Sequence, residues 1–220
     1  MSQLKKNNIL NLYFEVLTDG QKREFPNLIK FRKLGILAGG TALALQLGHR
    51  RSYDFDIFFS KPLIKNLLQK ARRIFGKISI VNRFEEELSF ITPFNVKITF
   101  FYYPFHPLFS LVPTSSIEII HWKDIALDKM YTIGRRAQYR DYIDLFFIMK
   151  EKKTSLDWLI KNALKKFEGL FSEKLFLDQL IYFADLRIEA VEFLKKEYGL
   201  QEIQKFFEKK VQEYTKKKIK

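Results

Sequence analysis

Hydrophobic positions recur at helical spacing near the start of the chain. Residues 7–17 and residues 21–33 each place apolar side chains three or four positions apart, the period of one helix face. The residues between them, Thr18-Asp19-Gly20, are typical of a break. The pattern predicts two helices that lean on a sheet beginning near Gly35.

The middle of the chain contains short apolar runs of the length of β-strands. Residues 36–59, ILAGGTALALQLGHRRSYDFDIFF, predict a strand, a turn, a helix, a loop and a second strand. Further strands are expected at residues 78–81, 88–91 and 96–103, with a short edge strand at 117–120. A helix is expected before the third strand, with Ser60 as its N-cap, Pro62 in its first turn and Gly76 at its end.

Helical spacing returns in the second half of the chain. Helices are expected over residues 123–133 and 142–149, from Thr154 or Ser155 to Gly169, from Ser172 to Leu194, and beyond Gly199. We therefore predict an α+β fold, in which a mixed β-sheet has flanking helices and a C-terminal helical region. Residues 1–150 are expected to form one domain with its N-terminal helices, and residues 151–220 a helical bundle with a basic tail.

Composition adds a bias toward anionic partners. The chain has 220 residues, of which 47% are hydrophobic and 23 are phenylalanine, so it can bury a sizeable core. Lysine and arginine number 39 against 25 acidic residues, which gives a net charge of +14. This excess favours polyanions, RNA above all, although it also fits acidic membrane surfaces or solubility alone. The absence of cysteine excludes a disulfide framework and a thiolate metal site.

Neither a membrane span nor a secretion signal is evident. No apolar run reaches 18 residues, and the opening MSQLKKNNILNLYFEVL has no long apolar segment. We therefore expect a cytoplasmic protein with no membrane partner. The closing run KKVQEYTKKKIK is typical of a solvated end, or of a grip on a nucleic-acid backbone.

Two carboxylates stand one residue apart in the apolar run DFDIFF. Because side chains i and i+2 of a strand share a face, Asp54 and Asp56 are expected to point one way while Phe55 and Ile57 fill the core. Two close carboxylates repel each other, and a hard divalent cation, Mg²⁺ or Mn²⁺, relieves that repulsion while keeping positions for water and phosphate. A lone Asp-x-Asp is also common on solvated strand faces.

The segment Gly39-Gly40-Thr41 joins a short apolar strand to a helical pattern. Glycines let the backbone approach a phosphate, and the start of a helix offers free N–H groups with partial positive charge. A Gly pair before a helix is also common in simple turns. Together with the Asp54 and Asp56 strand, however, the segment supplies a phosphate cradle and a metal site, which transfer from a nucleoside triphosphate requires.

A second informative stretch is WKDIALDKMYTIGRRAQYRDYIDLFFIMK. On a helix, Lys129 shares a stripe with Ile125 and Ile133, so its ammonium must either reach solvent along the stripe or meet a negative partner such as a triphosphate or the carboxylate site. Asp141 and Asp144 lie three residues apart and can share a helix face. Asp141 is equally suited to be the N-cap of that helix.

The motifs resemble a known enzyme group. The chain resembles the signature of the polymerase-beta-like nucleotidyltransferase fold, which is a hydrophobic residue, two glycines, thirteen residues and then Asp-hydrophobic-Asp-hydrophobic. It is similar to one branch of that fold, the AbiEii/AbiGii toxin family of nucleotidyltransferases, in the segments GGTALAL, HR, Ser52 and DFDIFF. DIALDKMYTIGRR and RDYIDLF resemble the later motifs of that family, with Arg140 where a lysine is common. The resemblance covers about residues 30–150.

The resemblance implies roles for individual residues. Lys129 would contact phosphate or act in catalysis, and Asp141 would complete the site, with Asp144 beside it among the nucleotide-binding groups. Arg50 and Ser52, between the helix and the acid strand, are expected to contact the β- and γ-phosphates, and Asp141 to orient or deprotonate the acceptor hydroxyl.

Many nucleotidyltransferases carry a third carboxylate on a later strand. No acid lies between Glu87 and Glu118 here, and Thr99 stands near the position expected for one. The resemblance therefore implies a site with two strand carboxylates.

The expected function is magnesium-dependent transfer of a nucleoside monophosphate from an NTP to an acceptor. The resemblance implies tRNA as the acceptor, a toxin–antitoxin or phage-defence role, and an antitoxin protein as a partner. Two alternatives stay open. One is a protein or small-molecule hydroxyl as the acceptor, and the other is a non-catalytic scaffold that binds RNA or a partner.

Overall fold

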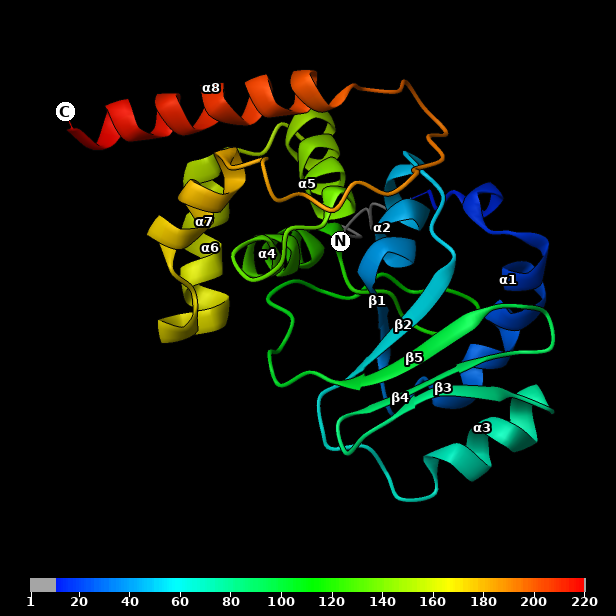
Figure 1. Cartoon of the computed structure of the whole chain (residues 1–220). Coiled ribbons are helices and arrows are strands. Elements are labelled where there is room, and N and C mark those ends of the chain that lie inside the picture. Colours follow the sequence, from blue (N-terminus) through cyan, green and yellow to red (C-terminus); the bar gives the residue numbers. More distant parts are fainter. Residues whose placement is uncertain (1–10, 220) are drawn as a thin grey trace, which may run out of the picture.

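A five-stranded mixed sheet forms the centre of the computed structural model, which describes residues 11–219 (Figure 1). The strands are β1 (Ile36–Ala38), β2 (Asp54–Phe59), β3 (Ser79–Arg83), β4 (Glu87–Ile91) and β5 (Lys97–Tyr102), in the order β1-β2-β5-β4-β3. β2 and β5 are parallel, and the other three pairs are antiparallel. The sheet with its flanking and C-terminal helices confirms the predicted fold class.

Alternation along β2 separates the core from the open face of the sheet. Phe55, Ile57 and Phe59 are buried, whereas Asp54 and Asp56 are partly exposed on the opposite face. The buried face is covered by the 3₁₀ helix η2 (Phe25–Phe31) and by α3 (Leu67–Phe75). Their aromatic rings pack together, with Phe31 stacked on Phe75 at 5.9 Å and tilted against Phe100 at 4.7 Å.

The start of the chain differs from the prediction. Of the helix expected over residues 7–17, residues 7–10 lie outside the described part, and the rest forms only the short 3₁₀ turn η1 (Phe14–Val16). The backbone N–H of Tyr13 donates to Leu45 O instead, which ties this segment to α2 (Gly39–Leu47). The expected break at Thr18 begins α1 (Asp19–Glu24), because Thr18 and Gln21 cap each other reciprocally.

The predicted start of α3 was wrong, whereas its end was correct. Asn66, not Ser60, occupies the N-cap, and residues 60–66 form a loop that carries the chain from the end of β2 to the far side of the sheet (Figure 1). Gly76 follows the last residue of the helix with a φ of +78°. The expected edge strand at 117–120 is reduced to isolated bridges from Ile119 to Leu37 and Val112.

Helices α4 to α8 form a second layer beside the sheet (Figure 1). They are α4 (Trp122–Ile133), α5 (Tyr139–Glu151), α6 (Leu156–Phe167), α7 (Glu173–Ile181) and α8 (Leu200–Ile219), with the 3₁₀ turn η3 (Glu168–Leu170) before α7. Ser155 and Ser172 cap α6 and α7 as predicted. Gln138 is the N-cap of α5, so the interpretation of Asp141 as its cap was wrong. The domain boundary near residue 150 stays a prediction.

The segment from 182 to 194 was expected to continue a helix and does not. α7 ends at Ile181, and the following chain runs as an irregular strap past the loop after α2 (Figure 1). Its backbone bonds go to that loop, from Arg51 N to Glu192 O and from Leu194 N to His49 O. These tertiary hydrogen bonds replace the intrahelical ones.

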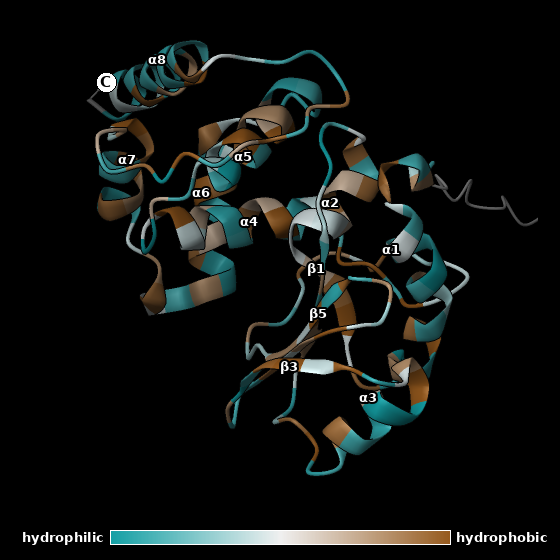
Figure 2. Ribbon diagram, turned by 45° about the vertical axis from the view of Figure 1, so that its right-hand side comes forward, coloured by the Kyte–Doolittle hydropathy of each residue, from teal (hydrophilic) through white to brown (hydrophobic). Residues whose placement is uncertain are grey.

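The last helix is amphipathic and lies on the others. Figure 2 shows hydrophobic and hydrophilic residues alternating along α8, and Ile203, Phe207 and Tyr214 are its buried side chains. Across residues 11–219, no helix combines the length and the apolar character that a membrane crossing needs.

Candidate functional site

The turn between β1 and α2 lies directly against the acid strand. Ala38 pairs with Asp56 across the sheet, and Gly39 follows with a φ of +67°, a conformation that favours glycine. A Cβ atom on Gly39 would overlap Asp56 Oδ2. Thr41 Oγ1 donates to Asp54 O at 2.5 Å, so the helix start and the strand are held together.

Gly40 occupies an equally close position on the other side of the turn. A Cβ atom there would lie 2.9 Å from Arg50 Nη2 and 2.9 Å from Ser52 Oγ. The structure therefore brings together all the residues that the first motif predicted, namely Gly39, Gly40, Thr41, Arg50, Ser52, Asp54 and Asp56.

The two strand acids have no cationic partner within the described chain. In residues 11–219, no ion pair and no side-chain hydrogen bond involves the carboxylate of Asp54 or Asp56. Burial, reinforced by the charge of Asp54, raises the pKa of Asp56 to about 6. A close pair of unpaired carboxylates is the donor set that suits a divalent cation.

The third strand position carries no acid. In the parallel ladder, Thr99 of β5 stands opposite Asp56, and Lys97 stands opposite Asp54. Among the described residues, no group of three or more His, Cys, Asp or Glu side chains has the geometry of a metal site. Asp54 and Asp56 are therefore two carboxylates that could hold a cation, and water or phosphate would supply the rest of its ligands.

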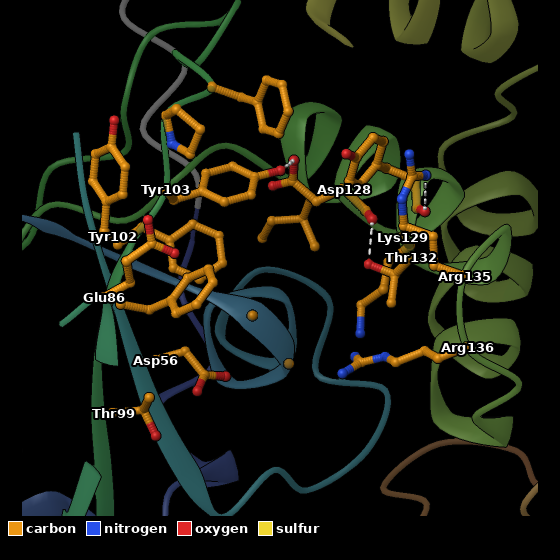
Figure 3. A pocket seen from close by; sticks show the side chains of 18 residues that line it. Asp56, Glu86, Thr99, Tyr102, Tyr103, Asp128, Lys129, Thr132, Arg135 and Arg136 are labelled. Atoms are coloured by element: carbon orange, nitrogen blue, oxygen red, sulfur yellow. Dashed lines mark hydrogen bonds between the residues drawn. The ribbon is translucent and has the colours of Figure 1, made fainter. Parts of the chain in front are cut away.

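A cleft of about 590 Å³ lies between the open face of the sheet and α4 (Figure 3). Gly39, Gly40 and Asp56 line one side of it, and Lys129 and Arg136 line the other. In Figure 3 the Lys129 ammonium and the Arg136 guanidinium point toward the space in front of Asp56. The cleft thus has an anionic side with two glycines and a cationic side facing it.

Lys129 is held by both acids of the RDYID motif. Its Nζ lies 2.6 Å from Asp141 Oδ1 and 2.7 Å from Asp144 Oδ2. Burial favours the neutral amine, but the two carboxylates outweigh it and raise the pKa of Lys129, so the side chain stays charged. An ammonium has three N–H donors, so one is left for the cleft.

Asp144 is the centre of a fully buried cluster. Arg50 binds it with two hydrogen bonds, from Nε at 2.7 Å and from Nη2 at 2.8 Å, and His49 Nε2 lies 2.9 Å from Oδ1. Burial alone would raise the pKa of Asp144, but the charges of Arg50 and Lys129 and the hydrogen bonds from His49 and Arg50 hold it well below its usual range. Burial lowers the pKa of His49, so the neutral ring donates from Nε2 to the carboxylate.

These contacts place two predicted phosphate ligands behind the cleft. Arg50 is 2% exposed, and neither Arg50 nor Asp144 lines the cleft. Both instead fix the position of Lys129. Asp141 also lies behind the cleft wall, where Arg136 Nε reaches its Oδ2 at 3.1 Å while Lys129 occupies Oδ1.

Sequence reasoning missed most of the residues that line the cleft, among them the charged Arg136, Asp128 and Glu86. Arg136 has a side chain that is 53% exposed, and its place in GRR just before RDYID was the available signal. Asp128 precedes Lys129 and faces the cleft beside it. Glu86 belongs to the acidic run before β4, whose pattern in the sequence is that of a solvated turn.

No model of a known protein family matches the sequence. The chain is 32% identical over 205 residues to the uncharacterized protein aq_aa25 of Aquifex aeolicus (strain VF5), which covers 88% of this chain and 97% of that protein. The resemblance to the AbiEii/AbiGii family therefore stays a prediction.

Two solved structures are similar in fold. One is an H. pylori protein provisionally described as a nucleotidyltransferase, with 21% identity, a TM-score of 0.54, and coverage of 90% of this chain and 94% of that chain. The other is MenT4, a nucleotidyltransferase toxin from Mycobacterium tuberculosis, with 12% identity, a TM-score of 0.58, and coverage of 87% and 81%. At these identities the likeness shows the fold, which is that of the nucleotidyltransferases.

Proposed function

This chain, which belongs to the same family as the uncharacterized protein aq_aa25 of Aquifex aeolicus, has the fold of the nucleotidyltransferases, and we propose that it is a nucleotidyltransferase. It would join the α-phosphate of an NTP to an acceptor hydroxyl and release pyrophosphate. The observation that carries the proposal is the unpaired carboxylate of Asp56 beside the Gly39-Gly40 turn, with Lys129 and Arg136 across the cleft. Asp54 lies two residues before Asp56 on β2.

Asp54 and Asp56 would hold a magnesium or manganese ion. Their oxygen donors, their mutual repulsion and the raised pKa of Asp56 all suit a hard cation. When bound, such an ion neutralises phosphate charge and aligns the triphosphate for attack.

The chain itself supplies the rest of the phosphate site. The N-terminus of α2 at Gly39, Gly40 and Thr41 offers backbone N–H groups that no helical carbonyl can reach. The third N–H of Lys129 and the exposed guanidinium of Arg136 would balance the charge that develops on the departing pyrophosphate.

The residues behind the cleft act by positioning. Asp141 and Asp144 accept from Lys129, and Arg50 anchors Asp144, so the ammonium is presented in one orientation. Both oxygens of Asp141 are occupied by cations, which supports an orienting role for it over removal of the acceptor proton. Ser52 Oγ, beside Gly40, stays our candidate for a phosphate contact.

For the acceptor we propose RNA, and tRNA in particular, in a toxin paired with an antitoxin protein. The net charge of +14 supports a polyanionic acceptor, and MenT4, which shares the fold, is named as a nucleotidyltransferase toxin. A phage-defence role is part of the same proposal.

The deciding experiment is incubation with Mg²⁺, total tRNA and each α-labelled NTP in turn, comparing the wild type with Asp54→Asn. We expect label on tRNA from the wild type alone. Label on an added protein or small molecule but not on tRNA would overturn the acceptor. Equal labelling by Asp54→Asn would overturn the metal assignment.

One observation favours a second candidate function. Thr99 occupies the strand position next to Asp56 where a third acid would stand, and this fits a non-catalytic scaffold that binds RNA or a partner. That scaffold would show no magnesium-dependent NTP binding and would label no acceptor of any class.

A further inference from the structure

The cleft continues from its charged end into an aromatic end. Phe58, Tyr103 and Phe105 form a chain of rings, with centroids 4.4 Å apart between Phe58 and Tyr103 and 5.2 Å apart between Tyr103 and Phe105. Tyr131 of α4 packs edge-on against Phe105 at 5.3 Å. All four rings line the cleft and are partly exposed.

Asp128 is the carboxylate beside this aromatic end (Figure 3). Its Oδ1 accepts two hydrogen bonds, from Tyr103 Oη at 2.8 Å and from the buried Lys166 Nζ at 2.6 Å. Within residues 11–219 its Oδ2 accepts none, and that atom is not enclosed by protein. Burial raises the pKa of Asp128 against the opposing charge and hydrogen bond of Lys166 and the hydrogen bond from Tyr103. In the ionised form, which pairs with Lys166 Nζ, both donors lie on Oδ1, so Oδ2 is left as a hydrogen-bond acceptor at the cleft.

We propose that the aromatic end binds the nucleobase of the NTP and that Asp128 Oδ2 accepts a hydrogen bond from an exocyclic amino group of that base. The inference rests on the proposed function, because it extends the cleft from the triphosphate site. Amino-bearing bases, namely cytosine, adenine and guanine, are therefore preferred over uracil.

The dimensions and chemistry of the cleft favour a nucleotide as its occupant. A volume of about 590 Å³ lies within the range of small-molecule and cofactor sites. Aromatic side chains stack on bases of any sequence, so Tyr103, Phe105 and Tyr131 give affinity without selection.

Selection comes from the carboxylate. An ionised carboxylate only accepts hydrogen bonds. Uracil has no exocyclic amino group, and its pairing edge has a carbonyl oxygen on each side of the N3–H group, and these oxygens repel the carboxylate. Cytosine, adenine and guanine each present an amino donor instead.

The test is to measure the Kd values of Mg²⁺ complexes of ATP, CTP, GTP and UTP by equilibrium dialysis. In the wild type we expect UTP to bind about tenfold more weakly than the best of the other three, the difference of one good hydrogen bond. In Asp128→Asn the amide oxygen stays toward Lys166 and Tyr103, so the NH₂ group takes the place of Oδ2. A donor then replaces the acceptor, and we expect the preference to turn toward UTP.

Glu86→Gln is the matched control, because it removes the other carboxylate charge that lines the aromatic part of the cleft. It should change all four Kd values by a similar factor and leave their ratios intact. An unchanged ratio in Asp128→Asn would overturn the assignment, as would an inversion caused by Glu86→Gln.

A second measurement keeps the inference testable if Asp128→Asn fails to fold. The wild type should bind CTP about tenfold better than the triphosphate of pyrimidin-2-one riboside, which lacks only the amino group. Equal affinities would overturn the role of Asp128 while leaving the transferase proposal intact. If none of the four NTPs binds in the presence of Mg²⁺, the proposed function fails first, and this inference fails with it.

Discussion

Gly39 and Asp56 are packed so closely that a Cβ atom on the glycine would overlap the Oδ2 atom of the acid. The glycine also has a φ of +67°, which an L side chain rarely adopts. Gly39→Ala should therefore lower the free energy of unfolding by more than the roughly 1 kcal/mol of backbone strain and should displace the carboxylate. Urea unfolding and magnesium-dependent NTP binding measure the two effects.

Gly76→Ala is the matched control. Gly76 has a similar φ of +78°, but a Cβ atom there has nothing within 4 Å. In this variant the free energy of unfolding should fall by about 1 kcal/mol, and the NTP affinity should not change. If Gly39→Ala also kept full affinity, the close approach of the turn to Asp56 would not matter for the site.

Asp56→Asn should make the protein more stable while abolishing its metal response. Burial and the charge of Asp54 raise the pKa of Asp56 to about 6, so between about pH 4 and pH 6 the folded state binds a proton that the unfolded state has released. The contribution of Asp56 to stability is therefore full below about pH 4 and is lost as the pH rises through about 6. At pH 7.5 in EDTA, Asp56→Asn should raise the free energy of unfolding by about 1–2 kcal/mol.

Thermal unfolding with and without Mg²⁺ and NTP checks the second half of this prediction. The ligands should raise the Tm of the wild type and leave that of Asp56→Asn unchanged. An equal rise in both proteins would place the metal elsewhere.

Lys129→Gln should weaken both the fold and the grip on phosphate. The substitution removes the cation shared by Asp141 and Asp144, although Arg136 still contacts the first and Arg50 the second. We therefore expect the free energy of unfolding to fall by about 2–3 kcal/mol. The affinity for pyrophosphate, which has no base, should fall about tenfold or more because the remaining donor of Lys129 is lost.

Lys166→Gln separates packing from chemistry. Lys166 also joins two acids, the buried Asp124 at 3.1 Å and the partly exposed Asp128 at 2.6 Å, but it lies behind the cleft wall. Its replacement should cost similar stability and leave pyrophosphate binding unchanged. Equal loss of pyrophosphate affinity in both variants would point to a general loosening of the helices.

Local periodicity was sufficient to predict the acid strand and its turn. The alternation in DFDIFF assigned Phe55 and Ile57 to the core and the two acids to the open face, and β2 has that arrangement. The stripe on α4 also indicated that Lys129 either reaches solvent along the helix or meets a negative partner. The two buried partners, Asp141 and Asp144, come from the next helix, and only the packing of α4 on α5 brings them there.

Residues brought together by tertiary packing could not be read from the sequence. Asp128 follows Leu127 in an ordinary amphipathic helix, and its relation to Tyr103 depends on how β5 and α4 face each other. The strap over residues 182–199 was expected to be helical as far as Leu194, yet its backbone hydrogen bonds to the loop at His49 and Arg51 prevail over that local preference. Propensity is a weak guide wherever such contacts compete.

The lysines at the end of α8 should contribute little to RNA binding. Lys218 pairs with Glu173 of α7, and Lys217 lies 3.6 Å from Asp157 of α6, so acids on neighbouring helices already offset part of their charge. Replacing Lys216, Lys217 and Lys218 with Gln should lower the slope of log K against log[salt] for tRNA by about one phosphate contact, well short of three.

The control for the tail is a charge-matched triple variant on exposed lysines of another region, with Gln at Lys30, Lys33 and Lys61. These residues lie on η2 and on the loops that flank it and β2, away from α8 (Figure 1). If the two triple variants lower the slope equally, net charge alone governs the binding of RNA. If the slope instead fell by three phosphate contacts in the α8 variant alone, the ion pairs to Glu173 and Asp157 would have to open when RNA binds. This follows because a lysine that keeps its carboxylate partner displaces no counterion from phosphate.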